Sequence, residues 1–300
     1  MGRTVFRMVR KRITQVFPFL LPIRRRQRKF CFYLGMALDG NTYSKTREDR
    51  PLSYEVFEIS SPMINGQSGY DIEYQFNKVH NLKLAAGTID HIVINPGETF
   101  SFYQLVRFAD KHIPYKDGLT LIDGKIVGTY GGGLCQLSNM LFWMFLHTPL
   151  TIVERHGHAV QAIPPGAENL PQGTDAAVNE GWLDLKVRND TLARYQVVIT
   201  FDDDCMYGKV LTDHAPSLSY EVFNKEIAYF EKKGRVFQTV SVWQRMLDKK
   251  TSRIQERFLY NNTCQIGYRL PDNIKVSKKE NENHEEEKGC GFIRRLLCRI

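Results

Sequence analysis

The sequence predicts an α+β fold in which a helix bearing a cysteine is followed by antiparallel strands, with a β-rich C-terminal extension. Three observations indicate this class. Apolar residues recur at helical spacing after Cys135, segments rich in strand-forming residues follow that helix, and long strand-like runs occupy residues 206–272. Strands that follow a helix in a run, instead of alternating with helices, are typical of an α+β domain.

The first helix is expected from Tyr74 to Ala86, because its apolar residues follow helical spacing and Gly87 comes next as a stop. Leu119 to Val127 predicts a β-hairpin that reverses at Asp123-Gly124, since this dipeptide favours a tight turn between strands. Both elements precede the glycine-rich segment that leads to the cysteine.

The central helix is expected to begin at or near Cys135, directly after the run Gly131-Gly132-Gly133-Leu134. Its strongly apolar composition predicts that it is buried. Leu150 to Ile163 then predicts a strand, a loop containing Pro and Gly follows it to Gly173, and Asp184 to Phe201 is again rich in strand-forming residues.

Composition divides the chain into four predicted segments. They are a basic N-terminal segment (1–50), an α+β domain (51–205), a β-rich extension (206–272) and a C-terminal tail (273–300). The tail is rich in Lys, Glu and Asn up to residue 289, which predicts disorder. Its last twelve residues predict a short basic amphipathic end.

Charge is distributed unevenly along the chain. Residues 1–29 contain ten Arg or Lys and no acid, whereas the whole chain has a net charge of +8, so the remainder is slightly acidic. The basic leader could contact an anionic membrane, at roughly 1 kcal/mol per charge near the surface, or remain a solvated terminus. Nucleic acid is not expected as a partner, because the body of the protein has no matching basic face.

The apolar stretches and the cysteines of the chain indicate where in the cell the protein is expected. No stretch reaches the roughly 18–20 apolar residues that a membrane-spanning helix needs. The six cysteines lie far apart without a CxxC pair, so neither a disulfide framework nor a zinc ribbon is predicted. The protein is therefore expected to be cytoplasmic, with peripheral contact to a membrane left open, and neither a cofactor nor a dedicated metal site is expected.

Cys135 is the cysteine whose surroundings predict chemistry. Three consecutive glycines (Gly131, Gly132, Gly133) indicate unusual backbone angles or a close approach by another group. The helix start that follows offers free N–H groups and a dipole that favour negative charge. Such a place lowers the pKa of a thiol, and the same N–H groups could hold an oxyanion. The alternative is a small residue packed under a tight turn.

The motif Glu154-Arg155-His156-Gly157-His158 supplies the second part of the candidate site. On a strand, Glu154, His156 and His158 would share one face. Two histidines with a carboxylate could provide a general base and the group that orients it. They could equally ligate a metal ion together with Cys135.

Asp175, in Gly173-Thr174-Asp175, could orient a histidine and complete a Cys–His–Asp arrangement, or it could simply form a turn. Gln136, beside the cysteine, could donate to an oxyanion. The catalytic candidates are therefore Cys135, His156, His158 and Asp175. The candidates for binding are Gly131, Gly132, Gly133, Gln136, Glu154 and Arg155.

These motifs carry a family resemblance. In chain order they are Asn77-Lys78 with Asn81, Pro96 to Phe102, Gly131 to Gln136, Glu154 to His158, and Gly173 to Ala176. Together they resemble the ordered signature of the VanW family over roughly residues 75–200, and Thr14 to Pro22 resembles the start of the protein that gives the family its name. The resemblance implies a link to vancomycin (glycopeptide) resistance and to the cell envelope, without supplying a reaction.

Three functions remain open from the sequence. The first is a cysteine-dependent acyl transferase or hydrolase acting on peptidoglycan or its precursors, with Cys135 as the nucleophile. The order cysteine, histidine, aspartate also resembles transglutaminase-like and papain-like enzymes, which is an analogy of order alone. The second is a non-enzymatic module that binds a carboxylate, such as the end of a cell-wall peptide. The third is a metal-binding protein that uses Cys135, His156 and His158.

Overall fold

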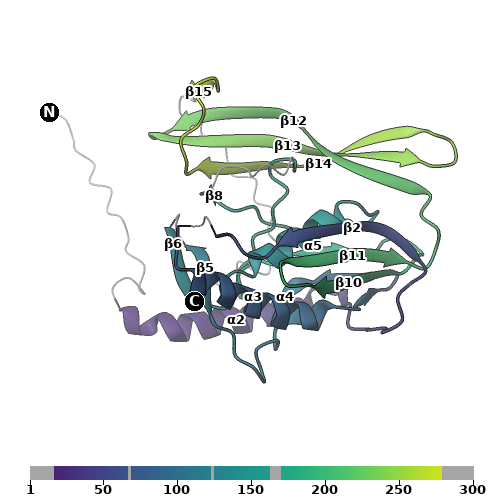
Figure 1. Cartoon of the computed structure of the whole chain (residues 1–300), viewed down its shortest axis with the longest axis horizontal. Helices are drawn as coiled ribbons and strands as arrows, with labels where there is room; N and C mark the ends of the chain where they lie inside the picture. The colour runs from purple at the N-terminus through teal and green to yellow at the C-terminus, as the bar shows by residue number, and fades with distance from the viewer. Residues whose placement is uncertain (1–16, 67–68, 123–124, 163–169, 279–300) are drawn as a thin grey trace. The chain divides into compact units, whose positions relative to one another are not determined.

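The computed structural model describes residues 17–66, 69–122, 125–162 and 170–278, which form two compact units (Figure 1). Among these residues, the smaller unit holds 17–41 and 180–182, and the larger unit holds the rest. The predicted amphipathic end and the Asp123-Gly124 turn lie outside the described residues.

The smaller unit is built on helix α2 (Leu21–Leu38), which follows a short 3-10 turn, η1 (Pro18–Leu20). Pro22 lies in the first turn of the helix, where its missing N–H is not needed. The hydroxyl of Tyr33 donates to Glu180 at 2.9 Å, and the guanidinium of Arg28 lies 4.1 Å from the ring centre of Trp182. Helix α2 thus lies within the basic N-terminal segment, for which the sequence predicted no particular element.

The larger unit contains an antiparallel sheet of four strands with two helices beside it. The sheet order is β2 (Tyr54–Pro62), β11 (Cys205–Thr212), β10 (Tyr195–Phe201) and β3 (Val93–Ile94). Helix α3 (Ile72–Ile89) runs past Gly87, so the predicted stop is wrong. The helix continues because Ile89, beyond the glycine, is fully buried.

The hairpin predicted between Leu119 and Val127 is confirmed as β5 (Asp117–Ile122) paired with β6 (Lys125–Tyr130). Asn81 of α3 fixes the base of this hairpin. Its side-chain amide donates to the carbonyl oxygens of Lys116 and Gly132, and its oxygen accepts from the N–H of Lys116. A fully buried polar side chain thus has all of these bonds satisfied by backbone groups.

A second sheet of four strands lies in the same unit, with a short helix, α4 (Phe102–Val106), after its second strand. Its order is β1 (Thr42–Tyr43), β4 (Glu98–Ser101), β9 (Lys186–Arg188) and β7 (Thr151–Glu154). The single strand predicted from Leu150 to Ile163 is wrong. It is divided into β7 and β8 (Val160–Gln161), and residues 155–158 between them are not in a strand.

The C-terminal extension is a twisted sheet of long strands (Figure 1). Its order is β15 (Val276–Lys278), β12 (Leu218–Lys232), β13 (Arg235–Asp248), β14 (Ile254–Ile266) and β8. Strand β8 pairs with β14 in parallel, so this sheet incorporates a strand from the candidate-site region. The disorder predicted for the tail is wrong at residues 276–278, which pair with β12.

Helix α5 (Cys135–Phe145) lies between the C-terminal sheet and the sheet that contains β2, β11 and β10 (Figure 1). It supplies much of the core. Met140 and Met144 cover Gly208 of β11, where a Cβ atom would collide with the sulfur of Met144 and the terminal methyl group of Met140. On another side of the helix, the ring of Phe142 lies 6.1 Å from that of Tyr260 on β14. The predicted α+β class with a β-rich C-terminal extension is confirmed. Within the described ranges, no helix is long and apolar enough to span a membrane.

Candidate functional site

Cys135 is the first residue of α5, and the glycines before it form a turn that only glycine fits. Gly131 and Gly133 have positive φ angles of 71° and 96°. A Cβ atom on Gly132 would lie 2.1 Å from the carbonyl oxygen of Gly118, in the first strand of the hairpin. The glycine run therefore seats the start of α5 directly against the hairpin backbone.

Lys78 of α3 lies across the same turn. This residue was not among the site candidates expected from the sequence. A Cβ atom on Gly133 would come within 2.3 Å of Cγ of Lys78. Burial lowers the pKa of this lysine to about 8, because the charged ammonium loses solvation. Its only signal in the sequence was its place in the Asn77-Lys78 motif.

No side chain caps the start of α5, and the N–H of Gln136 donates to the carbonyl oxygen of Gly133 at 3.1 Å. The partial positive charge of the helix N-terminus falls at Cys135. The thiol of Cys135 donates to the carbonyl oxygen of Val178 at 3.7 Å. Gln136 turns away to strand β2, where its amide donates to Ser61 and to the carbonyl of Pro62 at 2.9 and 2.7 Å. Its predicted role as an oxyanion donor has no support in this arrangement.

His158 interacts with both Cys135 and Asp175. Its Nδ1 lies 2.5 Å from Oδ2 of Asp175, and its backbone N–H donates to the same oxygen at 2.7 Å. Burial alone would lower the pKa of this histidine. The hydrogen bonds to Asp175 and Cys135, with the charges of both, outweigh burial and raise its pKa to about 10. Because Nδ1 faces Asp175, Nε2 is the ring nitrogen left for the thiol.

Asp175 is held in its ionised form by its neighbours. Its burial would raise the pKa of the carboxyl group, but the hydrogen bond from His158 and the charges of Arg155 and His158 lower it. Oδ1 of Asp175 lies 2.7 Å from the guanidinium of Arg155. A carboxylate with two cationic neighbours is suited to orient a histidine and to stabilise its protonated form.

Arg155 joins the candidate site to the C-terminal sheet. Its side chain is buried, with 7% exposed. It donates to the carbonyl oxygens of Gly173 and Asp175 and to the side-chain oxygen of Asn262 on β14, at 2.6–2.8 Å. Its guanidinium also lies 4.7 Å from the ring centre of Tyr260. This fixed, multiply bonded cation holds the Asp175 segment in place.

Helix α5 holds the same segment from the other side. The hydroxyl of Ser138 donates to the carbonyl of Ala176 at 2.6 Å, and the side-chain oxygen of Asn139 accepts from the N–H of Ala176 at 2.7 Å. Ser138, Asn139 and Asn262 were not predicted from the sequence. A signal existed for the first two, since they are polar residues within an otherwise apolar helix, one turn after Cys135.

His156 and Glu154 belong to a separate cluster. Nε2 of His156 lies 3.1 Å from Oε1 of Glu154, and Oε2 of the same carboxylate pairs with Lys186 at 3.1 Å. Glu154 Oε1 also accepts from the backbone N–H of Asp184. The buried Asp184 side chain accepts from the hydroxyl of Ser101, and burial raises its pKa to about 6. Of the two predicted histidines, His158 is therefore the one that interacts with Cys135.

A metal centre made of Cys135, His156 and His158 is not supported. Among the residues that the structure describes, no group of three or more His, Cys, Asp or Glu side chains is placed to hold an ion. The rings of His156 and His158 instead contact different carboxylates, Glu154 and Asp175. The metal-binding alternative therefore stays a prediction from the sequence, which elemental analysis of the purified protein would test.

A family model and a curated relative both point to one family. A family model described as "VanW like protein" matches residues 77–211, which include Cys135, His158 and Asp175. Vancomycin B-type resistance protein VanW of Enterococcus faecalis is 47% identical over 272 residues, covering 90% of this chain and 99% of that protein. Uncharacterized protein YoaR of Bacillus subtilis is 35% identical over 113 residues, or 38% of this chain and 36% of that protein. No solved structure matches the chain significantly.

Proposed function

The chain belongs to the VanW family, and from this premise we propose that it serves glycopeptide resistance as a cysteine-dependent acyl-transfer or hydrolytic enzyme. Its substrate class would be peptidoglycan peptides or their precursors. The observation that carries the chemistry is the Cys135–His158–Asp175 arrangement at the start of α5. The printed name of the Enterococcus faecalis relative, a vancomycin B-type resistance protein, supports the biological setting.

The first half-reaction would form a thioester. His158 takes the proton of the Cys135 thiol, and the thiolate attacks the carbonyl carbon of an amide or ester. The negative charge that develops on the carbonyl oxygen is stabilised by N–H groups at the start of α5. When the C–N or C–O bond breaks, His158 returns its proton to the leaving amine or alcohol. The acyl group is then bound to the sulfur of Cys135.

The second half-reaction releases the acyl group. A water molecule, or an amine of a second peptide, attacks the thioester carbon while His158 accepts its proton. The C–S bond breaks, and the proton held by His158 returns to the thiolate. Asp175 stays ionised throughout and fixes the ring through Nδ1, while Arg155 fixes Asp175.

The rate at which iodoacetamide alkylates Cys135, measured as a function of pH, tests the activated thiol. The other cysteines serve as internal controls. We expect a midpoint well below the ordinary thiol value of about 8.5. His158→Gln should raise that midpoint and slow the reaction, because it removes the imidazolium beside the sulfur. His156→Gln is the matched control, since His156 pairs with Glu154, and it should leave the midpoint unchanged. An unchanged midpoint in His158→Gln would reject the pair.

Resistance assays in cells separate catalysis from simple binding. If the protein acts through a thioester, Cys135→Ala and His158→Gln should both abolish its contribution to growth under glycopeptide, although both variants fold. A binding module would keep its full contribution in the Cys135→Ala variant. Full function of folded Cys135→Ala protein would therefore reject the enzyme and favour carboxylate binding at the same helix start.

A further inference from the structure

Helix α2 carries apolar side chains on two opposite sides. Phe32 and Met36 are buried, whereas Ile23 and Phe30 are 64% and 68% exposed. At about 100° per residue, Ile23 and Phe30 fall on the side of the helix opposite Phe32 and Met36. Leu38, 63% exposed, and the partly exposed Leu34 lie on that same outer side. The outer apolar stripe of α2 is therefore defined as Ile23, Phe30, Leu34 and Leu38.

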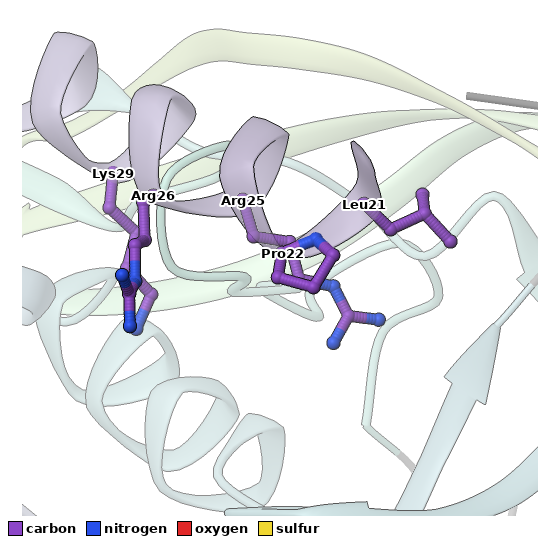
Figure 2. A pocket seen from close by; sticks show the side chains of 5 residues that line it. All are labelled: Leu21, Pro22, Arg25, Arg26 and Lys29. Carbon is purple, nitrogen blue, oxygen red and sulfur yellow. The ribbon is translucent and has the colours of Figure 1, made fainter. Parts of the chain in front are cut away.

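Helix α2 is basic and itself contains no acid, although Glu180 of the same unit pairs with Lys29. Residues 17–38 contain no Asp or Glu, and the helix carries Arg24, Arg25, Arg26, Arg28 and Lys29. By the same helical spacing, Arg24 and Arg26 border the outer apolar stripe on its two sides. Figure 2 shows the side chains of Arg25, Arg26 and Lys29 extending to one side of the helix, where they line a pocket with Leu21 and Pro22.

We propose that the outer face of α2 binds the surface of an anionic lipid membrane. A helix with an exposed apolar stripe and bordering arginines can lie in a membrane interface, with the apolar side chains inserted and the cations at the phosphates. Long arginine side chains reach the headgroups while their methylene groups cover apolar surface. Nucleic acid would use the cations but would leave Ile23 and Phe30 in water. The sequence before residue 17 adds five more basic residues and no acid.

Co-flotation of the full-length protein with lipid vesicles tests this proposal. We expect flotation with vesicles that contain phosphatidylglycerol, weaker binding at high salt, and no flotation with pure phosphatidylcholine. Arg24→Gln with Arg26→Gln should weaken partitioning about thirtyfold, the effect of two charges at roughly 1 kcal/mol each. Ile23→Ser with Phe30→Ser should weaken it at least about tenfold through lost apolar insertion.

Two matched pairs of substitutions on the C-terminal sheet serve as controls. Lys249→Gln with Lys250→Gln removes two exposed charges from the turn between β13 and β14. Ile254→Ser with Phe258→Ser removes two exposed apolar side chains from β14. Both control proteins should float as the parent does. Circular dichroism of each variant shows whether loss of binding is loss of folding.

Three outcomes would overturn the proposal. The first is equal flotation with neutral and anionic vesicles. The second is undiminished binding by folded α2 variants. The third is tighter binding to a short DNA duplex than to anionic vesicles, lost with the arginine substitutions but insensitive to Ile23→Ser with Phe30→Ser. The last result would assign the helix to nucleic acid.

Discussion

Two Asp–His pairs of the larger unit have nearly the same local geometry and different surroundings. Asp175 faces Nδ1 of His158 at 2.5 Å and an arginine, Arg155, at 2.7 Å. Asp213 faces Nδ1 of His214 at 2.6 Å and also pairs with an arginine, Arg194. The His214 side chain is 73% exposed, whereas that of His158 is 27% exposed and interacts with Cys135. Burial beside a thiol is therefore what makes the Asp175–His158 pair, rather than the Asp213–His214 pair, a candidate for catalysis.

Replacement of Asp175 should therefore make the Cys135 thiol less reactive, because Asp175 acts on the thiol through His158. Asp175→Asn removes the charge that raises the pKa of His158, so that pKa should fall, and alkylation of Cys135 at neutral pH should slow by about tenfold or more. The pKa is measured by NMR of the His158 ring, and the rate by mass spectrometry. Asp213→Asn, the matched control, should leave both unchanged. Equal effects of the two substitutions would show that Asp175 has no special relation to the thiol.

The raised pKa of His158 also predicts how stability depends on pH. Protonation of this residue is favoured in the folded state, so its stabilising effect is complete below the unfolded pKa of about 6.5 and is lost as pH rises to about 10. Lys78 acts in the opposite sense above pH 8, because its pKa is lowered, but it is present in both the parent and the variant. The stability difference between the parent and His158→Gln should shrink from pH 6.5 to 10 in urea titrations. A constant difference would contradict the raised pKa.

Among the elements, β14 approaches two segments of the site region, each at a glycine: Gly157 and Gly173. A Cβ atom on Gly157 would lie 2.3 Å from the side-chain oxygen of Asn262. Gly173 has a φ of 76°, and a Cβ atom there would lie 2.8 Å from Cβ of Asn262 and 2.9 Å from a methyl group of Val240. The close approach of β14 is what lets Arg155 bridge the Asp175 segment and the C-terminal sheet.

Gly173→Ala should consequently lower the free energy of unfolding by more than the strain of the positive φ angle would alone. Gly234, in the turn between β12 and β13, has a similar φ of 71°, but nothing lies within 4 Å of the methyl group that alanine would add, which makes it the control. We expect Gly234→Ala to lose about 1–2 kcal/mol of unfolding free energy through strain. Gly173→Ala should lose roughly 2 kcal/mol more through overpacking, with slower alkylation of Cys135. Equal losses in urea denaturation would mean that β14 does not pack tightly at Gly173.

These elements also show where prediction from sequence succeeded. The start of α5 at Cys135 was predictable because Leu137, Leu141 and Phe145 repeat locally, and glycines precede them. The course of residues 155–158 was not, since it depends on the contact between Arg155 and Asn262, 107 residues apart. Alternation along a supposed strand placed both histidines on one face, so it could not tell which of them meets the thiol.

Helix α2 was missed for a different reason. Its arginine run hides the helical period of its apolar residues, and Pro22 suggests a break although it lies where helices accept proline. Sequence periodicity detects a helix with one apolar side facing a core. It does not detect one that also has an outward apolar stripe, because the apolar residues then no longer gather on one side.

At the scale of the whole larger unit, the C-terminal sheet and the candidate site belong to one packed body. Gln244 of β13 donates to the carbonyl of Leu146 at the end of α5, Tyr260 donates to Gly173, and Asn262 accepts from Arg155. Buried polar contacts of this kind are costly to break singly, because each leaves an unpaired group. The sheet should therefore unfold together with the site helix.

Tryptophan fluorescence can test this cooperativity, because α5 contains Trp143 and β13 contains Trp243. Trp182→Phe with Trp243→Phe leaves Trp143 as the reporter of the site helix, and Trp143→Phe with Trp182→Phe leaves Trp243 as the reporter of the sheet. In each protein the urea midpoint from fluorescence should coincide with the midpoint from circular dichroism, as a single transition requires. A sheet reporter that changes well before the circular dichroism signal would mean that the sheet unfolds separately, and Arg155 would then hold Asp175 without needing β14.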